Sequence, residues 1–370
     1  MASPFHRRSL PDYFLTSPLA TLIHPLHQLL NTLRGPPRLP PPDAHPIRVV
    51  CISDTHTLEC ANVPDGDLLI HAGDLSNDGS VREIQATVDW LLTLPHPQKV
   101  VICGNHDSYF DVRSRLPEDQ HQQSATAISS SSYAAISSSS STTSSLHSLP
   151  ADDDPSAINW GDIHYLQHSS VTLTFPPTST STRPRTLTLY GAPQIPSIVP
   201  FTPIHAFTYP PHHNAWSHTI PPQTDILITH TPPQSHLDLS PTFSTGCPSL
   251  LAELWRVRPA LHVFGHVHAA AGIEPVFFDP AQRAWERICE RRRVRAKMGF
   301  WWRVLWGWVR DLVDVGGLVD AARVVGYGVM GVIWKWVWGG ECFGGAWLVN
   351  AACMVGDTGR LGNRVRVVVL

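Results

Sequence analysis

Short apolar runs that end in polar or glycine residues form the dominant pattern of this chain. Five such runs, rich in Val, Ile and Leu, lie at 48–52, 68–72, 99–103, 225–229 and 261–264. Apolar runs of this length, bounded by turn residues, predict buried strands. Helical spacing of apolar residues at 80–94 separates the second run from the third and predicts a βαβ unit. The pattern therefore indicates an α/β domain.

Acidic, imidazole and amide side chains follow each of these runs. In chain order they are Asp54, His56, Asp74, Asn105, His106, His230, His266 and His268. Because ligands of an open α/β sheet bind beyond the carboxyl ends of its strands, we expect these side chains at one edge. Carboxylate together with imidazole suits Mn, Fe or Zn better than Mg or Ca. A single histidine at a strand end is usually structural, but five such ends in succession are poorly explained in that way.

The remaining core segments predict a second sheet. Residues 171–175 and 186–190 have the pattern of a hairpin, and Cys247–Val257 has that of a helix. Two further strands, at 347–352 and 364–370, are expected to close the second sheet. Residues 193–223 form a long connection rich in Pro, His and aromatic residues. Because loops of this length are usually functional, we expect it to wall a substrate cleft; the alternative is a surface loop whose histidines have no role.

The ordered motifs resemble those of the calcineurin-like metallophosphoesterase superfamily. They are Asp54-x-His56, Gly73-Asp74, Gly104-Asn-His-Asp107, Thr229-His230 and Gly265-His-x-His268. A closer likeness is to its MPPED-type subfamily, through Cys51–His56, Tyr190–Pro193, Thr229–Pro233, Arg258-Pro259, Leu261–His266 and Asn350-Ala351. The resemblance covers about 47–110, 158–275 and 342–370. It implies a β-sandwich of two mixed sheets flanked by helices, with the metal site at the C-terminal ends of the strands.

The same resemblance implies a metal-dependent hydrolase of phosphoric esters. Two divalent ions, Mn²⁺, Fe²⁺/Fe³⁺ or Zn²⁺, would share Asp74 as a bridge. By resemblance, the first ion would also take Asp54, His56 and His268, and the second Asn105, His230 and His266. A metal-bridging hydroxide would attack phosphorus. His106 would protonate the leaving alkoxide, oriented by Asp107 or Asp78.

The spacing of the last motif adds a geometric expectation. Alternate residues of a strand point to the same side, so a strand through Gly265–His268 would let His266 and His268 reach one ion each.

The sequence departs from that of the Ser/Thr protein phosphatases after the Gly-Asp motif. In those enzymes an Asp and an Arg-Gly pair follow, whereas this chain has Gly73-Asp-Leu-Ser-Asn-Asp-Gly79. A missing arginine clamp for a phosphomonoester dianion favours a phosphodiester substrate, with a cyclic nucleotide as one candidate. The alternative function is a catalytically weak, membrane-associated scaffold that retains the fold.

The N-terminal 46 residues predict an amphipathic helix at 13–34 and a proline-rich linker. Pro18 suits the first turn of this helix, whereas Pro25 is expected to kink it. The stiff linker predicts a helix that stands apart from the core, and packing on the core is the alternative. The phosphoesterase domain, 47–370, is interrupted by a Ser-rich insertion at 112–157. Its composition predicts disorder and no catalytic role.

A second insertion, at 275–341, combines basic residues with tryptophans. Arg283–Lys297 holds seven Arg or Lys residues, and seven tryptophans lie between Trp301 and Trp338. We expect it to leave the core near the metal rim and, together with 13–34, to dock on a membrane face without spanning it. Its longest uncharged run, Val324–Trp334, is shorter than the ~20 residues that span a bilayer. The alternative is a helical hairpin packed on the helix at 13–34.

The net charge and the cysteine content limit which partners and which cellular compartment we expect for this protein. The net charge is −3, and the basic cluster adjoins an apolar segment, so no nucleic acid is expected. Seven cysteines without paired spacing do not form a disulfide framework, which favours a reducing, cytoplasmic location. Pro18, His24 and Pro25 interrupt the N-terminal apolar stretch, so no signal peptide is expected.

Overall fold

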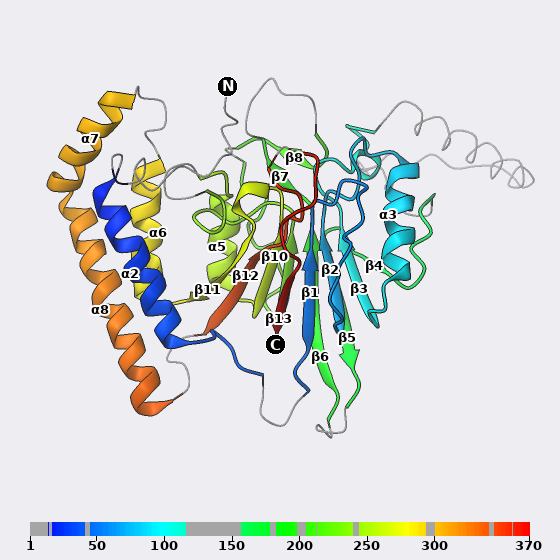
Figure 1. The fold of residues 1–370 in the computed structure, drawn as a ribbon, viewed down its shortest axis with the longest axis horizontal. Coiled ribbons are helices and arrows are strands. Elements are labelled where there is room, and N and C mark those ends of the chain that lie inside the picture. Colours follow the sequence, from blue (N-terminus) through cyan, green and yellow to red (C-terminus); the bar gives the residue numbers. More distant parts are fainter. Residues whose placement is uncertain are drawn as a thin grey trace, which may run out of the picture.

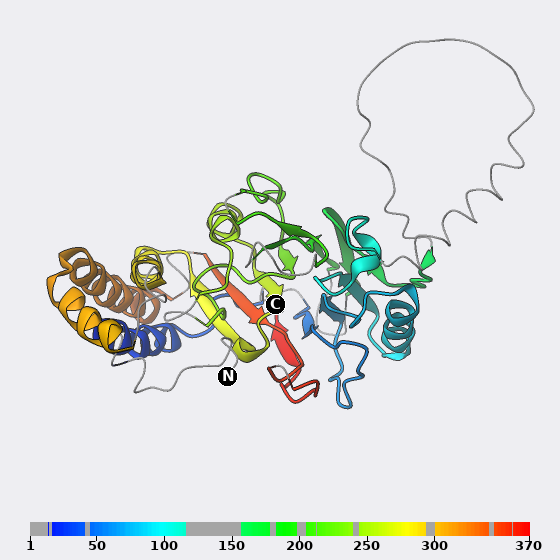
Figure 2. The same ribbon diagram turned by 90° about the horizontal axis from the view of Figure 1, so that it is seen from above.

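The computed structural model describes residues 14, 17–40, 45–115, 157–177, 183–197, 205–211, 213–239, 244–293, 300–339, 344–356 and 358–370. Two sheets lie face to face at its centre, and a layer of helices stands to one side of them (Figures 1 and 2). The Ser-rich insertion predicted at 112–157 lies outside the described residues apart from its two ends. The predicted α/β sandwich of two mixed sheets is confirmed.

The first sheet has the order β13-β1-β2-β3-β4. Its strands are β1 (Arg48–Ile52), β2 (Leu68–Ala72), β3 (Gln98–Ile102), β4 (His164–Tyr165) and β13 (Arg366–Val369). The first four are parallel, and β13 is antiparallel to β1, with Val50 opposite Val367. The prediction that 364–370 closes the second sheet is therefore wrong. The alternating pattern identified a strand there, but pattern alone does not specify its neighbour.

The second sheet has the order β11-β12-β10-β9-β6-β5. Its strands are β5 (Ser169–Phe175), β6 (Arg185–Ala192), β9 (Ile226–Thr229), β10 (Leu261–Phe264), β11 (Gly272–Phe277) and β12 (Gly345–Asn350). The central four are parallel, and β5 and β11 run antiparallel at the two edges. The predicted hairpin at 171–190 is β5–β6. A short pair, β7 (Ile195–Pro196) with β8 (Thr208–Tyr209), lies outside both sheets.

The core between the sheets follows from alternation along the strands. Val49 and Cys51 of β1 face the second sheet and pack in one cluster with Ile226, Ile228 and residues of β10. Their neighbours Val50 and Ile52 face the other way and pack under α3 (Val81–Thr93). The outer side of the second sheet is covered by α5 (Pro248–Val257). Both helices match the predicted segments.

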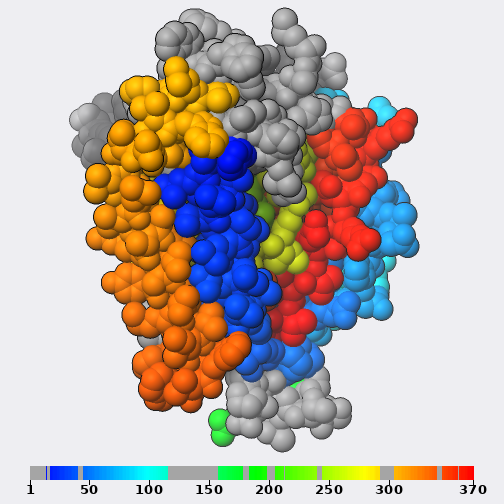
Figure 3. Space-filling model, turned by 60° about the vertical axis from the view of Figure 1, so that its left-hand side comes forward, coloured from blue at the N-terminus to red at the C-terminus, as the bar shows by residue number. Residues whose placement is uncertain are grey.

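The N-terminal helix belongs to a layer of four helices on the outside of β11. The layer consists of α2 (Pro18–Arg34), α6 (Pro280–Arg293), α7 (Phe300–Val313) and α8 (Val315–Trp338). Ala20 and Ile23 of α2 pack with Trp285 of α6 and Val324 of α8. Figure 3 shows α2 beside α7 and α8 on one face of the molecule. The helix does not stand apart from the core, because it covers apolar side chains that α6 and α8 leave open.

A buried ion pair fixes the end of α2. The Arg34 guanidinium lies 2.5 Å from the Asp279 carboxylate and 3.7 Å above the Phe277 ring. Both charged side chains are buried. Pro25 lies inside this helix, which runs unbroken from Pro18 to Arg34.

The second insertion joins the core at the end of the sheet opposite the carboxyl ends of the parallel strands, where the metal site is expected. Strand β11 starts beside Asn350 and ends with Phe277 opposite Gly345, where the parallel strand β12 begins. The prediction that the insertion emerges from a loop near the rim is therefore wrong. The reason is that Gly272–Phe277 forms an antiparallel strand, which the sequence pattern did not indicate. This strand carries the chain the full length of the sheet before α6 starts.

Replacing Arg34 tests the docking of α2. Arg34→Ala leaves the Asp279 carboxylate buried without its cation, and we expect about 3 kcal/mol of lost stability. Urea unfolding followed by tryptophan fluorescence measures the change. Arg38→Ala, which removes an exposed arginine four residues later, is the control and should shift the midpoint little. Equal midpoints for the two variants would contradict the docking.

Candidate metal centre

The eight candidate side chains meet at one rim of the sandwich. Asp54 and His56 follow β1, Asp74 follows β2, and Asn105 and His106 follow β3 of the first sheet. From the second sheet come His230 after β9, and His266 and His268 after β10. The rim lies at the carboxyl ends of these parallel strands, as the sequence predicted.

The backbone at this rim is strained in a way that turns side chains inward. Asp54, His56, Asp74 and His266 all have positive φ, between 47° and 68°. Each non-glycine residue in this region costs of order 1–3 kcal/mol, and such residues gather at functional sites. The fold therefore maintains an unfavourable backbone where these side chains converge.

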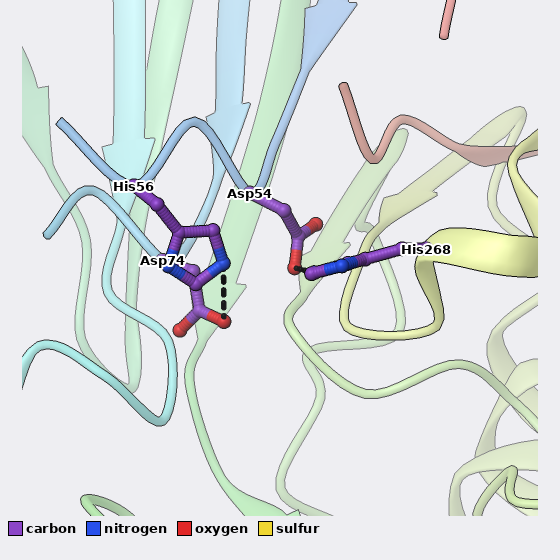
Figure 4. A group of neighbouring side chains, drawn as sticks. All are labelled: Asp54, His56, Asp74 and His268. Atoms are coloured by element: carbon purple, nitrogen blue, oxygen red, sulfur yellow. Dashed lines mark hydrogen bonds and ion pairs between the residues drawn. The ribbon is translucent and has the colours of Figure 1, made fainter. Parts of the chain in front are cut away.

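The first group of ligand-type atoms contains Asp54, His56, Asp74 and His268. Figure 4 shows His56 directed at Asp74 and His268 directed at Asp54. The His268 Nε2 atom lies 3.1 Å from Asp54 Oδ1, and the His56 Nε2 atom lies 3.7 Å from Asp74 Oδ2. One ligand atom from each residue lies within 4.8 Å of the others.

The second group contains Asp74 again, with His230 and His266. The His230 Nε2 atom lies 3.3 Å from Asp74 Oδ2. The Asn105 Oδ1 atom completes this group, at 3.0 Å from His230 Nε2 and 2.8 Å from His266 Nδ1. Asp74 is thus the carboxylate that both groups share.

His266 and His268 reach different groups for a reason that the sequence did not predict. Strand β10 ends at Phe264, so the expected strand through Gly265–His268 does not exist. His266 has a left-handed backbone, and His268 begins a short 3₁₀ helix. The Asn350 side-chain amide donates to the carbonyls of Val267 and Leu237, which holds this turn in place.

Glycine is required where backbone passes the carboxylates. A Cβ on Gly104 would meet the Asp74 carboxylate and would lie 2.7 Å from His230 Cε1. A Cβ on Gly265 would meet the Asp54 carboxylate and the Ser53 hydroxyl. These two positions leave room for the carboxylates to face the rim.

The electrostatics of the groups favour a cation. Burial would raise the pKa of Asp54, but the hydrogen bond and charge of His268 lower it to about 2. Burial would also raise the pKa of Asp74, yet His230 holds it well below its usual value. Burial would lower the pKa values of His230 and His268, but their carboxylate partners raise both to about 9. Two buried carboxylates therefore attract positive charge strongly.

Backbone carbonyls orient two of the imidazoles. His230 Nδ1 donates to the Ala72 carbonyl at 2.9 Å, and His268 Nδ1 donates to the Gly356 carbonyl at 2.8 Å. Each bond leaves Nε2 directed at a carboxylate, the arrangement that metal-ligating histidines usually have. The Nε2 atom of His56 is buried and has no hydrogen-bond partner. An unpartnered nitrogen among carboxylates, imidazoles and an amide oxygen fits an Mn, Fe or Zn ion.

His106 belongs to the rim but to neither group. Its ring lies 4.7 Å from the His56 ring, and its Nδ1 donates to the Asn77 carbonyl at 2.9 Å. The expectation that Asp107 or Asp78 orients His106 is wrong. The buried Asp107 carboxylate accepts from the backbone of Leu75, Ser76 and Gly104 and so ties together the loops after β2 and β3.

His205 is a rim residue that sequence reasoning did not single out. It lies in the long connection predicted to wall the cleft, and its ring is 5.7 Å from that of His106. The Ala206 backbone N–H donates to the Asn105 carbonyl, which fixes this segment to the rim. Burial, followed by the charge of His106, lowers the pKa of His205. The sequence offered no feature that distinguished His205 from the other histidines of the same loop.

Comparison with known proteins identifies the family. The family model described as calcineurin-like phosphoesterase matches residues 47–270, which contain every residue of both groups. The chain belongs to the calcineurin-like phosphoesterase family. This confirms the resemblance that the motifs indicated.

Named relatives support this membership and its MPPED-type branch. The chain is 33% identical over 240 residues to human metallophosphoesterase domain-containing protein 1, covering 61% of this chain and 62% of that protein. It is 31% identical over 241 residues to a UPF0046 protein of Caenorhabditis elegans, covering 63% of this chain and 68% of that one. It is 33% identical over 301 residues to a probable rhamnogalacturonate lyase C of Emericella nidulans, covering 75% of this chain but 24% of that protein.

Substituting Gly104 tests the close approach around Asp74. In the metal-free protein, Gly104→Ala should destabilise the fold by about 1–3 kcal/mol, because the new methyl group meets Asp74 and His230. Gly326→Ala is the control, since a Cβ there meets nothing within 4 Å. Thermal unfolding in the presence of a chelator measures both. An unchanged midpoint for Gly104→Ala would contradict the described packing.

Proposed function

We propose that this family member is a two-metal phosphodiesterase. The observation that carries the proposal is the sharing of Asp74 between two groups of ligand-type atoms. A carboxylate common to two sites is what a pair of ions ~3.5–4 Å apart requires. In the proposal, Asp54, His56, Asp74 and His268 hold one ion, and Asp74, Asn105, His230 and His266 hold the other.

The donor set supports Mn²⁺, Fe²⁺/Fe³⁺ or Zn²⁺ as the metals. Mixed imidazole and carboxylate ligands suit these ions, whereas Mg²⁺ and Ca²⁺ prefer oxygen. When bound, the ions would lower the pKa of a water molecule and neutralise charge on the phosphate oxygens. The protein side chains then have to orient the ester and protonate its leaving group.

His106 is placed for the second of these tasks. Its Nδ1–H bond to the Asn77 carbonyl fixes the ring and leaves Nε2 available at the rim. As water oxygen bonds to phosphorus and the bond to the ester oxygen breaks, an imidazolium at His106 can pass its Nε2 proton to the departing alkoxide. The imidazole of His205 lies next to His106 and is a candidate contact for the leaving group.

The charge around the rim favours a phosphodiester over a phosphomonoester. In the described part of the chain, no Arg or Lys side chain forms a hydrogen bond or ion pair with the eight rim residues. A monoester dianion would gain from such a cation, and a diester monoanion needs it less. A small diester, with cyclic nucleotides among the candidates, is therefore the proposed substrate class.

Replacing Asp74 tests the shared carboxylate. Asp74→Asn should abolish binding of both ions and reduce diester hydrolysis to background, because each group loses the same anionic ligand. Asp78→Asn, in the same loop but outside both groups, should retain both properties. Metal content per chain, measured by mass spectrometry after reconstitution, separates the two. Two ions bound to Asp74→Asn would contradict the proposal.

Replacing His106 tests proton donation. His106→Ala should keep the metals but lower turnover by about 10²–10⁴ for an alkyl ester. The loss should be much smaller for a p-nitrophenyl ester, whose leaving group needs no proton. His213→Ala, which removes an exposed histidine of the long connection at 193–223, is the control. Equal losses for the two esters would exclude His106 as the proton donor.

A further inference from the structure

The carboxylates in and beside α7 and α8 are turned toward the neighbouring helices. Asp320 is 1% exposed and accepts from Arg287 and Arg291 of α6 and from Arg323. Asp314 caps α8 by accepting from the Gly317 backbone and also accepts from Arg291. In a helix on the surface of a soluble domain, such groups normally face water.

Asp311 shows the same inversion at the end of α7. It is buried, accepts from the Arg310 side chain, and accepts from the Leu19 N–H and the Ser17 hydroxyl at the start of α2. The Arg34 cation of α2 is likewise buried against Asp279. The contacts on the inner side are therefore ion pairs between α8 and α6, hydrogen bonds from the start of α2 to the Asp311 carboxylate of α7, and an ion pair between the end of α2 and Asp279 just before α6.

The outer side of these helices is apolar. Large hydrophobic side chains are exposed along the whole layer: Leu22, Leu29, Leu33, Leu305, Trp306, Trp308, Val309, Leu312, Val313, Val315, Leu318, Val319, Tyr327, Val329, Met330, Ile333, Trp334, Trp336, Val337 and Trp338. We call this set the outer face. Leu312 and Trp336 are 81% and 72% exposed. So many large apolar side chains exposed on neighbouring helices indicate an interaction site.

We propose that the outer face docks this protein on a lipid bilayer, with α2, α7 and α8 lying in the plane of the membrane. Among the described side chains of these three helices, every carboxylate is turned inward. The charged side chains of α2, α7 and α8 and of the residues just after α2 that remain exposed or half-buried in the described structure are cationic: Arg323, Lys335 and Arg38. These three cations, here called the cationic border, complement anionic headgroups.

The distribution of tryptophans also favours lipid. Trp306 and Trp308 lie in α7, and Trp334, Trp336 and Trp338 lie at the far end of α8. Tryptophan prefers the interfacial zone of a bilayer, where its ring is in apolar surroundings and its N–H is near water. A twofold contact with a second copy would instead place the same cationic border against itself.

The contacts of α8 explain why it would lie on the membrane and not cross it. In the described chain, α8 is the helix whose length and composition would allow it to span a bilayer. Its inner side, however, contacts α6 and α2 over most of its length, from Asp314 and Asp320 to Gly328 beside Leu30 and Gly331 beside Arg34. Crossing would require these ion pairs to break. An in-plane helix buries only its apolar side in the headgroup region.

Vesicle flotation of the full chain tests the proposal. The wild-type protein should float with phosphatidylcholine vesicles. At low salt, adding phosphatidylserine to the vesicles should increase the fraction bound, with the binding constant rising about fivefold for each basic residue near the membrane surface. Leu318→Glu/Met330→Glu places two carboxylates on the outer face and should reduce binding at least tenfold. Val112→Glu/Val355→Glu, which changes two exposed valines outside the helical layer, should bind as the wild type does. Circular dichroism should show that both variants are folded.

Three results would overturn the proposal. The first is the absence of wild-type flotation with both lipid compositions. The second is flotation that Leu318→Glu/Met330→Glu leaves unchanged. The third is a stable dimer in light scattering that this variant dissociates while the vesicles remain free of protein, since the outer face would then bind a second copy. Diester hydrolysis in detergent-free solution is measured in parallel, so a failure of docking remains distinct from a failure of the proposed catalysis.

Discussion

The site depends on one buried carboxylate, Asp74, that two groups of imidazole and carboxylate ligands share. A buried anion is costly unless it is paired, and this one faces imidazoles from both sheets. His56 approaches it from the first sheet and His230 from the second. The carboxylate thus joins the two halves of the sandwich at the rim, and a cation between them would relieve the cost of burying it.

The surrounding fold serves this arrangement. Left-handed backbone at Asp54, His56, Asp74 and His266 turns the side chains toward one another, at a cost that the packed sheets must offset. Gly104 and Gly265 leave the space that the carboxylates occupy. Asp107 and Asn350 bind no ligand atom of the groups, but their hydrogen bonds hold the loops from which those ligands project. The amide of Asn350 accounts physically for the Asn350-Ala351 motif.

The sequence predicted the parts of the molecule that local patterns determine. Apolar runs identified the parallel strands, and the residues after them converge because parallel strands end at one edge. Patterns could not specify which sheet receives 364–370, because strand pairing is decided by packing between distant segments. The antiparallel β11 was missed for a similar reason, so the insertion was placed at the wrong end of the sheet. His205 reaches the rim through tertiary packing that spacing alone does not reveal.

The helical layer and the rim are separate parts of one molecule. Arg34 and Asp279 attach the end of α2 beside the edge strand β11, while the rim occupies the opposite end of β12. None of the eight rim residues belongs to the outer face, so the docking proposal uses no residue of the metal groups. Anomalous diffraction from crystals soaked in Mn²⁺ tests the central claim most directly. The account predicts two peaks, one on each side of the Asp74 carboxylate, and a single peak or none at that carboxylate would contradict it.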